Sequence, residues 1–265
     1  MKTRIILAIL LITMILSVAC KKRDNSKPDP SIAEQVVTFA PLPSFKEVYE
    51  VLDQLQTKDI SAAVPKELYK TNQDEIRNSF SLGLLTADAV LAAKGRNSNK
   101  LKDISASMMN LTSLLALEAE VNQLGDDMRT MIEKQQWEEL DAALDAHKKS
   151  VEDKLWESEN YDNYTIMLMG GWIEAANRVA WLLQQNYDLE RSKVLAQKGT
   201  FNHLVTNMKT IDTPHYIEDE AFKTSITQLE ELQQIINADT NGSYTKEQID
   251  SIIKGTDAIK ATFQK

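Results

Sequence analysis

Three charged residues interrupt the two most apolar segments of the chain. Asp88 lies within FSLGLLTADAVLAA, and Glu174 and Arg178 lie one helical turn apart within IMLMGGWIEAANRVAWLL. An unpaired charge in an apolar interior costs several kcal/mol, so these side chains should find one another or other partners. Two hypotheses follow: a polar ligand pocket between helices, or an ion-pair network that fixes helix register. We favour the network, because buried ion pairs in helical bundles more often have a structural role.

A loop near the C-terminus has the pattern of a degenerate calcium site. In residues 237–248, NADTNGSYTKEQ, Asp239 and Asn241 occupy the third and fifth positions of an EF-hand loop and Ser243 the seventh. An asparagine replaces the first aspartate, and Gln248 replaces the bidentate glutamate that calcium requires at the last position. The loop therefore lacks the charge of a calcium site, and we predict an ordinary turn between helices.

The other residues that could ligate a metal or a cofactor do not form a recognisable set. No histidine has a glutamate three residues before it, which a di-iron bundle would need. His147 follows the apolar spacing of its segment, so we predict a core histidine bonded to a neighbouring side chain. Methionines at helical spacing are ordinary core residues, and no CxxCH motif accompanies them. We therefore predict no metal and no cofactor. The alternative is an enzyme or a cofactor-carrying bundle with its site between the Asp88 and Glu174 segments.

The first twenty residues predict export and lipid attachment. Lys2 and Arg4 precede an apolar run from Ile5 to Val18, which is too short to span a membrane comfortably. The end of this run, LSVAC, resembles the lipobox of bacterial lipoproteins, with the leucine one place earlier than usual. The resemblance implies cleavage before Cys20, the only cysteine, and its acylation. An ordinary secretory signal that happens to contain a cysteine is the alternative.

Beyond the signal peptide of residues 1–19, the chain divides into a tether and a domain. Residues 20–43 carry charges, four of the six prolines and little apolar periodicity, which indicates a flexible tether after the acylated cysteine. Residues 44–265 suit a single domain. Lys21, directly after the cysteine, favours the outer membrane over the inner one in the enterobacterial sorting pattern. No acidic run follows the cysteine, which favours the periplasmic side.

The charge of the chain restricts its partners. The sequence has 39 acidic and 30 basic residues, a net charge of −9, and no basic stripe that would contact phosphates. We therefore predict no nucleic-acid partner. An acidic domain is also repelled by anionic lipid, so the acyl chains on Cys20 should make the membrane contact.

Apolar spacing predicts helices throughout residues 44–265. Apolar residues recur every three or four positions, and no long alternation with polar residues predicts a strand. The fold class is therefore all-α, a bundle of about seven to eight helices in which two similar packed halves are one arrangement. Residues 166–183 are apolar on all sides, so they should form the central helix. The expected helices cover residues 44–56, 72–94, a third segment ending at Gly125, 126–156, 161–187, one or two segments within 189–211, 214–236 and a last one after Thr245.

The two apolar segments also carry a family resemblance. LGLLTAD, residues 82–88, and GGWIEA, residues 170–175, both pair glycine with an acid inside an apolar helix. This combination resembles helical lipoproteins common in Bacteroidetes. The resemblance implies a helical fold and an envelope location, and it transfers no catalytic residue. We expect a non-enzymatic helical module, anchored to the envelope membrane, that binds or scaffolds an envelope protein or a small molecule.

Overall fold

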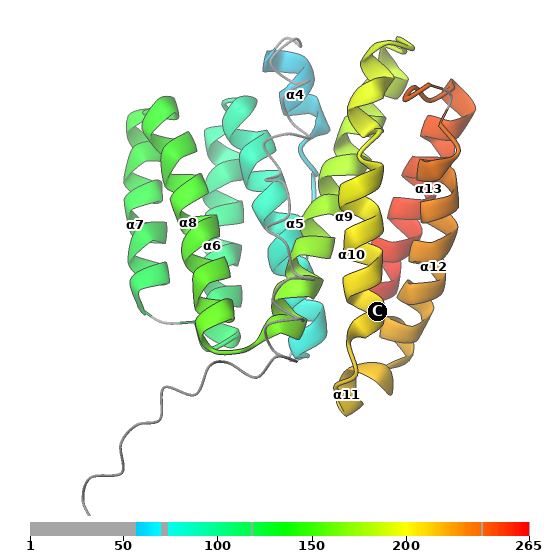
Figure 1. Cartoon of the computed structure of the whole chain (residues 1–265). Coiled ribbons are helices and arrows are strands. Elements are labelled where there is room, and N and C mark those ends of the chain that lie inside the picture. The colour runs from blue at the N-terminus through cyan, green and yellow to red at the C-terminus, as the bar shows by residue number, and fades with distance from the viewer. Residues whose placement is uncertain (1–56, 70–73, 118, 240, 265) are drawn as a thin grey trace, which may run out of the picture. The chain divides into compact units, whose positions relative to one another are not determined.

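The computed structural model describes residues 57–69, 74–117, 119–239 and 241–264. The regular structure of these residues is helical and includes no strand, which confirms the all-α prediction (Figure 1). Cys20, the signal peptide, the tether and the helix expected at 44–56 lie outside the described residues. In chain order the helices are α4 Thr57–Ala63, α5 Glu75–Lys94, α6 Ser98–Leu114, α7 Ala119–Lys134, α8 Trp137–Glu157, α9 Tyr161–Gln185, the 3-10 helix η2 Arg191–Leu195, α10 Lys198–Thr210, α11 Pro214–Ile217, α12 Glu220–Asn237 and α13 Lys246–Phe263.

Helix α9 is the hub around which the other helices pack. It contacts α4, α5, α8, η2, α10 and α13. At 100° per residue, Met167, Ile173 and Val179 point to three different sides of α9, and all three are buried. A helix that is buried on every side must be apolar on every side, so the prediction of a central helix is confirmed.

The helices form two groups of four within the described part of the chain. In the first group, α5, α6, α7 and α8 pack in sequence and α8 returns to α5. In the second group, α9, α10, α12 and α13 pack in the same cyclic manner. Figure 1 shows the first group on the left and the second on the right. The most extensive helix contact joins the first helices of the two groups, α5 and α9.

Helices α5 and α9 run parallel to each other. Near their N-terminal ends, Glu75 of α5 accepts a hydrogen bond from the side-chain amide of Asn163. Farther along, Asp88 of α5 binds the guanidinium of Arg178. Both contacts advance in the same direction along the two helices, which places the C-terminal halves of α5 and α9 beside each other.

Two glycines bring the backbones of α5 and α9 into contact. A Cβ added to Gly83 would lie 1.9 Å from the carbonyl oxygen of Met167. One added to Gly170 would lie 2.3 Å from the carbonyl oxygen of Phe80. The relation is reciprocal, because each glycine faces the residue three positions before the other glycine. Only glycine permits so close an approach of two helices at these points.

The helix ends between residues 98 and 157 differ from the prediction. The sequence indicated one helix ending at Gly125 and one beginning after it, whereas the structure has three helices and places Gly125 inside α7. The breaks lie at Ala116 and Gln135, which adopt left-handed φ angles of 54° and 57°. After Ala116, the amide of Leu117 donates to the carbonyl of Thr112 at 2.9 Å, the hydrogen bond that closes a left-handed helix cap.

Side-chain caps decide where α5, α12 and α13 begin. Asp74 accepts a hydrogen bond from a backbone amide of the first turn of α5, so it is the N-cap and the helix begins later than the predicted residue 72. Asp219 caps α12 in the same way and divides the helix expected at 214–236 into α11 and α12. The helix expected after Thr245 is confirmed, and α13 begins with a capping box in which the side chains of Thr245 and Gln248 accept hydrogen bonds from each other's backbone amides.

Candidate functional site

The three charged residues meet between α5, α9 and α13. Nε of Arg178 lies 3.4 Å from Oδ1 of Asp88, and Nη2 of Arg178 contacts Oε1 of Glu174. Both acidic side chains are 0% exposed, and the arginine side chain is 16% exposed. One guanidinium therefore bridges the two carboxyl groups. The structure brings together all three residues that the sequence singled out.

Lys260 of α13 supplies a second cation to the same site. Its Nζ lies 3.0 Å from Oε2 of Glu174, and its side chain is 9% exposed. Lys260 is not among the residues that the sequence singled out. Lys260 follows Thr256 by four positions on the buried side of α13, where an apolar residue is expected. A lysine at such a position indicates a buried charge, but the neighbouring residues in the sequence do not identify Glu174 as its partner.

The amide of Asn177 completes the connection between α9 and α13. Its oxygen accepts a hydrogen bond from Lys260 at 2.8 Å. Its nitrogen donates to Oγ1 of Thr256 at 2.8 Å and to Oδ1 of Asp257 at 3.0 Å. Lys260 also lies 3.2 Å from Asp257. Buried polar groups of α9 and α13 thus satisfy one another, which fixes the register of the two helices.

The environment gives the two carboxyl groups opposite protonation states. Burial, followed by the neighbouring charge of Glu174, raises the pKa of Asp88 well above its usual range. Burial also acts to raise the pKa of Glu174, but Lys260 and Arg178 outweigh it and hold that pKa below its usual value. The site therefore favours the protonated form of Asp88 and the ionised form of Glu174.

Tyr69 approaches the site from the segment that follows α4. Its hydroxyl accepts a hydrogen bond from Nη2 of Arg178 at 3.4 Å. Burial, and then the charges of Glu174 and Asp88, raise the pKa of Tyr69, so the phenol stays neutral. Two acids, two cations and a phenol therefore meet at this site. This is the geometry of an ion-pair network that fixes helix register; the ligand-pocket hypothesis stays a prediction.

The loop between α12 and α13 is a turn whose side chains bind within the protein. Oδ1 of Asp239 pairs with the amine of Lys198 in α10. Asn241 and Gly242 adopt left-handed φ angles of 55° and 81° and make the turn, and Ser243 is buried. Among the described residues, no group of three or more histidine, cysteine, aspartate or glutamate side chains is arranged to hold a metal ion.

His147 is buried in α8, as its apolar spacing predicts. Its side chain faces the core with the residue 1% exposed, and neither ring nitrogen has a hydrogen-bond partner among the described residues. The predicted bond to a neighbouring side chain is therefore wrong. The helical pattern places a residue on the buried side of α8 but cannot show whether a polar atom faces it there. Burial lowers the pKa of His147 to about 4, so the imidazole is neutral near pH 7.

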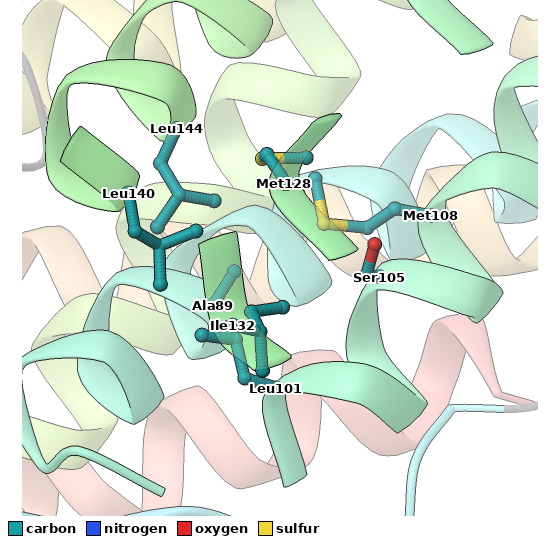
Figure 2. A pocket seen from close by; sticks show the side chains of 8 residues that line it. All are labelled: Ala89, Leu101, Ser105, Met108, Met128, Ile132, Leu140 and Leu144. Carbon is teal, nitrogen blue, oxygen red and sulfur yellow. The ribbon is translucent and has the colours of Figure 1, made fainter. Parts of the chain in front are cut away.

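A narrow apolar hollow lies inside the group formed by α5 to α8 (Figure 2). It has no space for a water molecule. Among the described residues, Ser105 contributes the only polar side chain of its lining, and none of them is a hydrogen-bond partner of its hydroxyl. The hollow therefore carries no group arranged for chemistry. Its lining consists of Ala89, Leu101, Ser105, Met108, Met128, Ile132, Leu140 and Leu144.

Comparison with known proteins leaves the charged site to be interpreted on its own geometry. No protein-family model, curated protein or solved structure matches the chain. Within the described ranges, none of the helices combines the length and the apolar character that crossing a membrane requires.

Proposed function

We propose that this protein is a lipid-anchored lipoprotein of the bacterial envelope whose helical domain binds or scaffolds a partner and catalyses no reaction. One observation carries the proposal: the only cysteine, Cys20, ends an LSVAC sequence directly after a basic and apolar signal. Acyl chains on this cysteine would hold the domain at the membrane through the tether of residues 21–43. We place it at the outer membrane, on the periplasmic side, because Lys21 and no acidic run follow the cysteine.

The geometry of the charged site supports a binding module over an enzyme. Asp88 and Glu174 are fully buried, and the groups that bind them come from α9 and α13. Catalytic acids and bases must reach a substrate, whereas these two carboxyl groups contact residues of the protein itself. Their connections hold three helices in register and make the domain a rigid support for a binding surface. The partner is an envelope protein or a small molecule.

Mass spectrometry of the mature protein from its native host tests the anchor. We expect the N-terminus to be an acylated Cys20 and the protein to sediment with the outer membrane. Cys20→Ser is the matched control, because it removes the acceptor thiol and should leave an unacylated chain. An unmodified N-terminus on a freely soluble wild-type protein would refute the anchor.

Two measurements on the purified wild-type protein separate a binding module from the alternative function. Co-purification from the native envelope should recover one partner in a fixed ratio from wild type and much less from Cys20→Ser, which is not held at the membrane. An absorption spectrum and a metal analysis test the alternative, an enzyme or cofactor carrier with its site at Asp88 and Glu174. A coloured product or one metal ion per chain would overturn the proposed function in favour of that alternative.

A further inference from the structure

We propose that the charged site is a proton-dependent latch, in which one proton shared between Asp88 and Glu174 fastens α5 to α9 and α13, and loss of that proton loosens the contact. This inference concerns the mechanics of the domain and does not depend on which partner the protein binds. It uses the only two acidic side chains that are fully buried among the described residues.

The cations at the site are unequally divided between the two acids. Glu174 contacts both Arg178 and Lys260, the latter at 3.0 Å. Asp88 has one cationic neighbour at the longer distance of 3.4 Å, the Nε of Arg178. Its second oxygen, Oδ2, accepts no hydrogen bond from the described residues. Asp88 therefore lacks the partners that an ionised buried carboxylate needs, and a proton on it removes that need.

The groups that face Asp88 come from every side of the site. Glu174 and Arg178 face it from α9, Lys260 acts on it from α13, and Tyr69 lies beside it from the segment before α5. Both cations are already bound to Glu174. An ionised Asp88 would therefore place two negative charges side by side away from water, which disfavours the closed site.

The sign of the pH dependence follows from this arrangement. Burial and Glu174 raise the pKa of Asp88 in the folded protein, whereas the unfolded value is about 3.9. Between these two values the folded state holds one proton more than the unfolded state, so stability falls as the pH rises. The unfolding equilibrium constant should increase by up to about tenfold per pH unit in this window.

Urea unfolding of the mature full-length protein between about pH 5 and pH 9 tests the latch. Asp88→Asn removes the titrating proton and keeps an N–H donor for Glu174. The ratio of the wild-type to the Asp88→Asn unfolding constant should rise with pH, and contributions from other groups cancel in this ratio. Asp257→Asn is the matched control: it makes the same change beside Lys260 on a side chain that is 58% exposed. The ratio of the wild-type to the Asp257→Asn unfolding constant should not change with pH.

A ratio of wild type to Asp88→Asn that is constant over this range would overturn the latch. Infrared spectroscopy of the wild type gives a second test, which does not require Asp88→Asn to fold. Near pH 6, exposed carboxyl groups are ionised, and a buried protonated acid should give a separate carbonyl band. That band should vanish as the pH rises. Its absence at about pH 6 would equally overturn the proposal.

Discussion

Replacing Gly83 with alanine should push α5 and α9 apart where their backbones touch. The new Cβ would lie 1.9 Å from the carbonyl oxygen of Met167 and 2.7 Å from the amide nitrogen of Gly171. Both are backbone atoms, so no side-chain rotation can relieve the overlap. Ordinary contact begins at 3.4 Å, and the helices must therefore separate locally by about 1.5 Å.

The expected loss of stability follows from this separation. A gap of about 0.5–1 Å already removes a quarter to a half of the dispersion energy of an atomic contact. The contact between α5 and α9 is the most extensive one between described helices, so many atomic contacts weaken together. Overpacking costs roughly 1–3 kcal/mol, and we expect the upper end because the obstacle is backbone. The better helix propensity of alanine returns about 1 kcal/mol, which leaves a net loss of about 2 kcal/mol.

Urea unfolding of the full-length protein, followed by circular dichroism, measures this loss against a matched control. A Cβ on Gly199 in α10 would meet no atom within 4 Å, so Gly199→Ala should be neutral or stabilise by up to about 1 kcal/mol. Gly170→Ala should behave like Gly83→Ala, because its Cβ would lie 2.3 Å from the carbonyl oxygen of Phe80. Equal urea midpoints for Gly83→Ala and Gly199→Ala would refute the backbone contact between α5 and α9 at Gly83.

Further substitutions test the packing and the polar groups of the core. Ala175→Leu should lower Tm by about 2–4 °C for each kcal/mol of overpacking, and an unchanged Tm would place α9 at the surface. Glu174→Ala should lower Tm more than Glu174→Gln, which keeps an acceptor for Arg178; the reverse order would contradict the ion pairs. Because burial lowers the pKa of His147 to about 4, the free energy of unfolding of the wild type should fall by roughly 3 kcal/mol relative to that of His147→Leu as the pH falls from about 6.5 to about 4 in urea titrations. A difference that does not change with pH would contradict the burial of a neutral imidazole. Ser105→Ala should leave Tm unchanged or raise it, since the buried hydroxyl has no hydrogen bond; a large decrease would reveal a missed partner.

The sequence predicts those features that depend on residues close together in the chain. The burial of α9 follows from a segment that is apolar on every side, and the start of α13 follows from Thr245 and Gln248, three residues apart. The meeting of Asp88 with Glu174 was predictable because each lies in a segment where water is excluded. The contact between Lys260 and Glu174 was not predictable, because the two residues lie on different helices and only the packing of α13 on α9 brings them together.

The ends of α6 and α7 were beyond prediction for a different reason. Glycine is the usual residue in a left-handed helix cap, and the sequence analysis therefore ended a helix at Gly125. The caps instead use Ala116 and Gln135, residue types that occur freely inside helices. The hydrogen bonds that close these caps, such as the one from Leu117 to Thr112, offset the strain of the left-handed conformation. The residue types at these two positions therefore do not predict a left-handed cap.

The close approach of α5 and α9 also explains why the charged site needs a proton. Asp88 lies five residues after Gly83, and Glu174 lies four residues after Gly170. Because the helices are parallel, both acids come about one turn beyond the glycine contact, on neighbouring stretches of backbone. Glycine packing thus brings two carboxyl groups into a space that excludes water. Arg178 alone cannot neutralise both, and the second cation, Lys260 of α13, is shared with Asp257, which favours a protonated Asp88. In both helices a glycine is followed about one turn later by an acid. The backbone contact at the glycines therefore places the two acids where they share Arg178.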